Sequence, residues 1–356
     1  MRDRRAAIVA LMSSFLTPNT CFSRPGVPIA DTHSHFSLRR GNLAAEMSDN
    51  RVVLLALKVV PDHKYIKPTS ERIEVLRVPS EDDLYYEFEQ SVRSTLSYLS
   101  DIKIPLIRSR LDVDKALAGD PHIVLSSEGG DFLSGQLQRL ERAYRSGIRH
   151  LQLVHYVPSP YGDIQSSPPK HGGLTKYGAN VLAKCNELGI LVDTAHMDMR
   201  TLDAAIEISN KPLIWSHGWV STTEGFYSDR FGFQSRRLSM NHAKKISSKG
   251  GLVGLWSLGL GGYSRTLSPD YPISSQSNES LSSYAKALAK LSKELGSDHV
   301  CIGTDYGGLG PYSVIQSYKD LRIVCDALSD HGLSDSEIDK VSYKNYASLL
   351  KTVMVE

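Results

Sequence analysis

The chain has 356 residues, of which 41% are hydrophobic and 22% are charged, with a formal net charge of +2. This composition is typical of a globular chain rather than a disordered one, and the small net charge gives no reason to expect a nucleic acid or an anionic membrane as partner. The four cysteines, Cys21, Cys185, Cys301 and Cys325, are far apart and form no CxxC pair, so the sequence indicates neither a zinc knuckle nor a disulfide framework.

Residues 1–28 form a lead-in before the first predicted strand. Residues 1–5 are basic and residues 6–16 are apolar, as in a short signal peptide, but no clean small-x-small cleavage site follows them. We therefore favour an amphipathic helix and a cytoplasmic protein, with export as the alternative. No run of about 20 apolar residues occurs, so no transmembrane segment is expected.

Eight strand-like runs alternate with helical patterns along the rest of the chain. The runs begin near Ile29, Val52, Ile123, Leu151, Ile190, Leu213, Leu252 and Val300, and the clearest helical patterns cover residues 82–99, 132–144, 174–188, 280–295, 314–328 and 336–353. Such alternation predicts parallel strands joined by crossover helices, and eight repeats fit a closed (β/α)8 TIM barrel. We expect residues 29–356 to form this single domain; an open doubly wound sheet is the alternative, but no GxGxxG follows the first strand.

Three stretches rich in Gly, Ser and either Pro or aromatic residues are expected to be loops, namely residues 157–173, 218–235 and 261–278. Each follows the carboxyl end of a predicted strand. In a barrel, loops at that end build the substrate pocket.

Five of the apolar runs end in residue types that bind metals. The endings are His33 and His35 after the first run, and then Glu128, His196, His217 and Asp305. Because the carboxyl ends of barrel strands meet at one rim, we expect these six side chains to gather there around divalent metal.

His33 and His35 should point to the same face of the first strand, because side chains alternate along a strand. Two imidazoles on one face can hold one ion. Glu128 can bridge two ions through its two oxygens, although a helix N-cap or a salt bridge is the alternative.

His196 and His217 end consecutive strands, so both rings can reach a second ion; two structural core histidines are the alternative. Asp305 ends the last strand, which neighbours the first strand in a closed barrel. It could therefore bind the first ion, orient the attacking water and carry its proton away.

Three further residues are candidates for contact with a substrate. His155 ends a strand and could polarise a substrate carbonyl, or it could be an ordinary polar strand end. Arg236 and Arg237 are expected to start the helix after the loop that follows His217. An arginine there could hold a substrate carboxylate bidentately, and a solvated basic pair is the alternative.

These residues, in this order, resemble the membrane (renal) dipeptidase family of zinc peptidases. The best local similarity is Gly172-Gly-Leu-Thr-Lys-Tyr-Gly178 followed by Val192-Asp-Thr-Ala-His196, which is similar to the family's Gly-Leu-Thr-x-x-Gly helix and the strand ending Asp-x-Ser-His. Further similar segments are Ser127-Glu-Gly-Gly130, Ser216-His217, Ile302-Gly-Thr-Asp305 and Tyr343-Lys-Asn-Tyr346. The resemblance covers nearly the whole chain from about Ile29.

The resemblance implies a (β/α)8 barrel that carries two zinc ions and hydrolyses dipeptides, often as a homodimer. It implies that Glu128 bridges the metals, that His33 and Asp305 bind the first ion, and that His196 and His217 bind the second. His155 would contact the substrate carbonyl. Arg236, with Arg237 as a close second, would face the substrate carboxylate.

One departure concerns the first motif, which is His-x-Asp in the family and His33-Ser-His35 here. The imidazole removes one negative charge from around the first ion, and the His-x-His pattern also resembles the wider amidohydrolase group. We therefore expect metal-dependent hydrolysis of a dipeptide, or of a similar small acyl-amino acid, by a metal-activated water. An amidohydrolase that cleaves another small amide, cyclic amide or ester, and a non-catalytic metal-binding barrel, are the alternatives.

Overall fold

The computed structural model describes residues 26–36, 41–69, 73–221, 235–258 and 280–355. The lead-in helix predicted before the first strand lies outside these residues, except for residues 26–28, which are not helical. The loop predicted at residues 261–278, and most of the one at residues 218–235, also lie outside them. Within the described residues, no helix is both long enough and apolar enough to cross a membrane.

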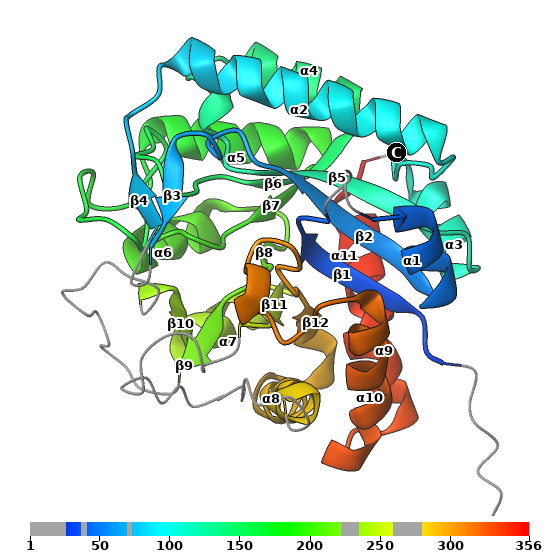
Figure 1. The fold of residues 1–356 in the computed structure, drawn as a ribbon. Helices are drawn as coiled ribbons and strands as arrows, with labels where there is room; N and C mark the ends of the chain where they lie inside the picture. Colours follow the sequence, from blue (N-terminus) through cyan, green and yellow to red (C-terminus); the bar gives the residue numbers. More distant parts are fainter. Residues whose placement is uncertain (1–25, 37–40, 70–72, 222–234, 259–279, 356) are drawn as a thin grey trace, which may run out of the picture.

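Eight parallel strands close into a barrel in the order β1-β12-β11-β8-β7-β6-β5-β2 (Figure 1). Their bounds are β1 (Ile29–Ser34), β2 (Val52–Val59), β5 (His122–Glu128), β6 (Ile148–Gln152), β7 (Leu191–Asp193), β8 (Ile214–Trp215), β11 (Leu252–Leu255) and β12 (Val300–Ile302). The predicted (β/α)8 barrel is confirmed. The largest error in a strand start is at β6, which begins three residues before Leu151.

The helices on the outside of the barrel are α1 (Leu43–Asp49), α2 (Glu81–Asp101), α3 (Arg110–Leu117), α4 (Leu137–Ser146), α5 (Lys176–Leu188), α6 (Met199–Ile208), α7 (Met240–Ser248), α8 (Ser280–Leu295) and α9 (Tyr318–Ala327). α10 (Asp335–Asp339) and α11 (Asn345–Val353) follow, joined by a π-helical segment, Lys340–Lys344. Two short sheets stand outside the barrel: the hairpin of β3 (Ile66–Pro68) with β4 (Ile73–Val75), and β9 (Trp219–Ser221) paired with β10 (Arg237–Ser239).

Two helix predictions need correction. The helix predicted at residues 132–144 is a 3-10 turn, Asp131–Leu133, followed by α4. The helix predicted to start at Arg236 begins only at Met240, because Arg237 opens strand β10, which pairs with β9. The Ser239 side chain then caps α7 by accepting from the His242 amide.

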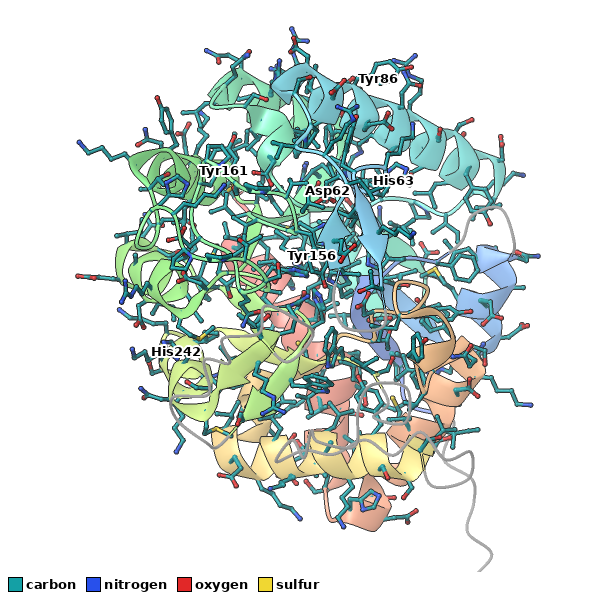
Figure 2. The ribbon with its side chains drawn as sticks, turned by 60° about the vertical axis from the view of Figure 1, so that its left-hand side comes forward. Asp62, His63, Tyr86, Tyr156, Tyr161 and His242 are labelled. Atoms are coloured by element: carbon teal, nitrogen blue, oxygen red, sulfur yellow. The ribbon has the colours of Figure 1, made fainter. Side chains whose placement is uncertain are left out.

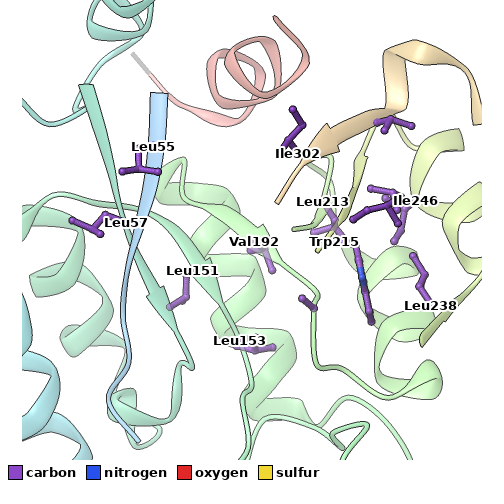
Figure 3. Close-up of a cluster of buried hydrophobic side chains, with 14 of the residues drawn as sticks. Leu55, Leu57, Leu151, Leu153, Val192, Leu213, Trp215, Leu238, Ile246 and Ile302 are labelled. Atoms are coloured by element: carbon purple, nitrogen blue, oxygen red, sulfur yellow. The ribbon is translucent and has the colours of Figure 1, made fainter. Parts of the chain in front are cut away.

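Both faces of the barrel strands are buried, which explains their continuous apolar runs. In β2, Leu54 belongs to the cluster inside the barrel. Leu55 belongs to the larger cluster between the strands and the helices, part of which Figure 3 shows. The inner cluster joins strand residues to Val113 of α3 and to Leu350 and Val353 of α11. α11 therefore closes the amino-terminal end of the barrel, and functional side chains are left to the opposite end.

The longest helix, α2, is held to the barrel by aromatic stacking. The rings of Phe88 on α2 and Phe132 are parallel, with 3.7 Å between their centroids, and both are fully buried. Tyr86 lies on the outer face of the same helix and is 60% exposed (Figure 2).

We expect Phe88→Ala to lower the free energy of unfolding by about 3–5 kcal/mol, because it removes a buried ring and leaves a cavity against Phe132. Tyr86→Ala is the matched control and should change it by less than about 0.5 kcal/mol. Urea denaturation followed by circular dichroism measures both. Equal effects of the two variants would contradict the role given to the stacked rings.

Candidate metal centre

All the predicted site residues except the arginines lie at the carboxyl ends of barrel strands. His33 is in β1 and His35 directly follows that strand, while Glu128 is the last residue of β5. The others follow their strands by two or three residues, namely His155 after β6, His196 after β7, His217 after β8 and Asp305 after β12. The structure therefore brings together at one rim the side chains that the sequence predicted to meet.

Glu128 is at the centre of this group. Its carboxylate, 3% exposed, lies within reach of the Nε2 atoms of five histidines: 3.1 Å from His35, 3.3 Å from His33, His155 and His196, and 3.7 Å from His217. A buried carboxylate among imidazoles is costly unless charge of the opposite sign accompanies it.

The histidines around Glu128 form two pairs. The Nε2 atoms of His33 and His35 are 3.2 Å apart, and those of His196 and His217 are 3.3 Å apart. Two nitrogen ligands on a tetrahedral zinc, each at about 2.0–2.1 Å, are about 3.3 Å apart. With Glu128, each pair makes a group that could hold a metal ion, so the residues fit divalent metal binding.

Asp305 adds a carboxylate to the first pair, with its Oδ1 atom 3.1 Å from Nε2 of His35. The buried Asp31 carboxylate links strand β1 to the segment after β12. It accepts hydrogen bonds from the amides of His33 and Thr304 and from the Thr304 hydroxyl. This junction fixes the distance between the first histidine pair and Asp305.

Two of these residues have a strained backbone. His196 and Asp305 adopt the left-handed region, with φ of 73° and 55°. Non-glycine residues rarely adopt this conformation, and it persists where the surrounding structure imposes it, often at functional sites.

The protonation of the histidines favours metal binding. Burial lowers the pKa of His33 to about 4 and lowers the pKa values of His196 and His217 well below their ordinary value, so these rings are neutral, as metal ligands must be. Burial also lowers the pKa of His35, but the carboxylates of Glu128 and Asp305 outweigh it and raise the value to about 9. His35 therefore lies where two carboxylates attract a cation.

His155 differs from the other histidines because its Nδ1 atom is bound to a carboxylate, 2.7 Å from Asp62 Oδ1. Burial lowers the pKa of His155, but Asp62 and Glu128 raise it to about 10, so the ring is an imidazolium. Asp62 also accepts hydrogen bonds from the amides of Tyr156 and Val157, and Figure 2 labels Asp62 and Tyr156. His155 is thus a fixed donor beside Glu128.

The two candidate arginines have different surroundings. Arg236 is 1% exposed, and its guanidinium donates to Gln165, to the Tyr156 hydroxyl and to Nε2 of His217. Its charge also lies 5.3 Å from the ring centre of Trp256. Arg237 is turned to Trp219, outside this cluster. The structure therefore places Arg236 beside the histidines.

A buried polar network lies beneath the rim. Asp193, the last residue of β7, accepts from Lys58 at 3.4 Å and pairs with His150 at 3.2 Å, and His150 also contacts the Tyr346 hydroxyl. The Lys58 amine donates to the Ser126 hydroxyl as well. His150 is the third residue of β6 and points into this network.

Sequence reasoning gave no role to Lys58, Asp62, Asp193, Ser216 or Gln165. Lys58 did carry a signal, because a lysine inside the apolar run of β2 needs a buried partner. Asp193 and Ser216 also stand at ends of apolar strands. Asp62 and Gln165 come from loops and carried no comparable signal.

Comparison with known proteins gives consistent matches. The sequence model of the family described as membrane dipeptidase, peptidase family M19, matches residues 90–355. A dipeptidase of Aspergillus oryzae named aclJ is 24% identical over 79% of this chain, and an uncharacterized dipeptidase of Schizosaccharomyces pombe, C965.12, is 25% identical over 61%. The chain spans 65% and 49% of the lengths of these two relatives.

Solved structures share the fold. A metallo peptidase from Rhodobacter sphaeroides, liganded with a phosphinate mimic of the dipeptide L-Ala-D-Ala, has a TM-score of 0.75 at 19% identity, with 92% of this chain and 99% of that chain covered. An amidohydrolase from Pseudomonas aeruginosa has a TM-score of 0.71 at 17% identity, with 93% and 97% covered.

We expect Lys58→Met to lower the free energy of unfolding by about 3–5 kcal/mol, because it leaves the Asp193 carboxylate buried without its cation. The control is Lys351→Met, which breaks the Lys351–Asp114 pair, whose side chains are 38% and 51% exposed, and should cost at most about 1 kcal/mol. Urea denaturation of the two variants makes the comparison. A loss at Lys58 no larger than at Lys351 would show that Asp193 does not depend on the amine.

Proposed function

The chain belongs to the membrane dipeptidase family, peptidase family M19, and on that basis we propose that it hydrolyses the amide bond of a dipeptide or a similar small acyl-amino acid. The observation that carries the proposal is that two closely spaced pairs of histidines surround the Glu128 carboxylate. We propose two divalent ions as cofactors, with zinc as the favoured metal, and homodimerisation remains a prediction of the family resemblance.

In this proposal, His33, His35 and Asp305 would hold the first ion, His196 and His217 would hold the second, and Glu128 would serve both. The spacing of the imidazole nitrogens supports this assignment. Divalent ions supply Lewis acidity towards a carbonyl and lower the pKa of water.

Two residues of the chain would handle charge and protons. Asp305, 10% exposed at its side chain and beside His35, accepts the proton of the attacking water and passes it to the leaving amine. His155 donates a hydrogen bond to the substrate carbonyl oxygen as negative charge develops there. The buried Asp62 supports this role because it keeps the imidazolium charged and oriented.

Arg236 is proposed to bind the carboxylate of the substrate. Gln165 and the Tyr156 hydroxyl accept hydrogen bonds from its guanidinium and so fix its plane. The guanidinium also contacts His217, a proposed ligand of the second ion. Arginine binds a carboxylate bidentately with directional hydrogen bonds. A substrate with a free carboxylate close to the scissile bond fits this arrangement, as a dipeptide does.

A second candidate is an amidohydrolase activity on another small amide, cyclic amide or ester. The observation that favours it is His35, which stands where the family motif has a carboxylate. Both activities need the same ions, so they differ in substrate and not in metal content. Two ions without dipeptide turnover would favour this second activity, and a folded chain that takes up no metal would favour a non-catalytic barrel.

Glu128→Gln should abolish the turnover of dipeptides and lower the bound metal from two ions per chain, because a neutral amide bridges two cations poorly. Glu187→Gln, on the surface of α5, is the matched control and should keep both. Metal analysis by mass spectrometry, together with an assay of L,L- and L,D-dipeptides, measures the effects. Full activity of Glu128→Gln would end the two-metal proposal.

Arg236→Gln should raise KM for a dipeptide with a free carboxylate by about 10- to 100-fold, since a bidentate charged contact is worth about 1.5–3 kcal/mol. The neighbouring Arg237→Gln should leave KM within about twofold. Steady-state kinetics with a dipeptide and its C-terminal amide separates the two roles. An equal rise in KM for the amide would contradict carboxylate binding by Arg236.

A further inference from the structure

Ser216, between β8 and His217, contacts both histidine pairs at once. Its hydroxyl oxygen lies 3.0 Å from Nδ1 of His33, in the first pair, and 3.0 Å from Nδ1 of His217, in the second pair. Ser216 is fully buried, and the two rings it contacts are 3.7 Å apart at their centroids. One hydroxyl therefore supports a ring from each proposed metal site.

This contact spans the barrel, because β8 and β1 are separated by β11 and β12 in the strand order. Both intervening segments carry a glycine where the chain passes Ser216. A Cβ atom at Gly254 or at Gly303 would overlap the Ser216 carbonyl oxygen. The absence of these two side chains lets Ser216 reach across to His33.

Hydrogen bonds fix the Ser216 backbone in that position. Its amide donates to Asp193 Oδ1 at 3.1 Å, and its carbonyl accepts from the Thr32 hydroxyl at 3.2 Å. Asp193 is in turn held by Lys58 and His150. The buried network below the rim thus ends at the serine that contacts both pairs.

The chemistry of imidazole gives this contact a role. A neutral histidine that binds metal through Nε2 carries its proton on Nδ1, and the partner of that proton fixes the tautomer and the ring orientation. A serine oxygen has two lone pairs, so it can accept both Nδ1 protons together. His33 and His217 turn their Nε2 atoms towards Glu128, as this role requires.

We propose that Ser216 is a positioning residue shared by the two metal sites, and that it sets the tautomers of His33 and His217 together. The inference rests on the proposed two-metal function. It predicts that loss of this one hydroxyl lowers the affinity for both ions, although the hydroxyl itself would contact neither ion.

The test is a zinc titration of chelator-treated protein against a chromophoric chelator, for wild type, Ser216→Ala and Ser216→Thr. We expect Ser216→Ala to weaken both ions by about 10- to 100-fold, as loss of such supporting contacts does. Ser216→Thr keeps the hydroxyl and should hold both ions within a few-fold of wild type. The control is Ser292→Ala, which removes a buried hydroxyl that donates to the Leu288 carbonyl of α8 and should leave both affinities unchanged.

Weakening of one ion alone, of neither ion, or of both ions equally in the alanine and threonine variants would overturn the shared role. Fewer than two ions in the wild type would overturn the two-metal proposal and this inference with it. Two ions in the wild type with no dipeptide turnover would overturn the proposed activity alone, because the zinc titration does not depend on turnover.

Discussion

The site depends on one interaction, the contact of the buried Glu128 carboxylate with histidines from four other strand ends. Burial raises the pKa of Glu128, but the neighbouring His155 and His35 imidazoliums outweigh it, and the pKa falls well below its ordinary range. An ionised carboxylate in this position attracts cations to both of its oxygens. Both histidine pairs contact it, and His33, His196 and His217 supply neutral nitrogen ligands, so the same carboxylate organises both halves of the site.

The barrel interior is built to keep those ligands in place. Its amino-terminal half is apolar and is closed by α11, whereas its carboxyl-terminal half holds the charged residues Lys58 and Asp193, and the buried Asp31 lies nearby against Tyr318 of α9. A buried charge destabilises the folded protein unless an opposite charge pairs with it. This region therefore stabilises the fold less than an apolar core of equal volume would. What it supplies is position, since Asp31 connects His33 with the segment of Asp305, and Asp193 holds the backbone of Ser216.

The sequence was sufficient for the barrel and for the rim, because both follow from simple periodicities. A strand buried on both faces is an apolar run, and the residue after it lies at the rim, so His196 and Asp305 could be placed without knowing their neighbours. It was insufficient where the chain leaves that pattern. Arg236 was expected to begin a helix, but pairing of β10 with β9 delays that helix and turns the side chain inward. Asp62 lies in a loop, and only the closed fold brings it to His155.

His35 stands where the family motif has aspartate, and this difference affects the charge of the whole site. With two dications in the site, Glu128 and Asp305 would be the anionic ligands, while Arg236 and the His155 imidazolium add positive charge nearby. The site would then carry excess positive charge in a region of low solvent access, where charges interact strongly. An anionic substrate relieves that excess, whereas a substrate ammonium adds to it. His35 departs from the family motif, but the positive charge that it leaves in the site favours a substrate recognised through its carboxylate.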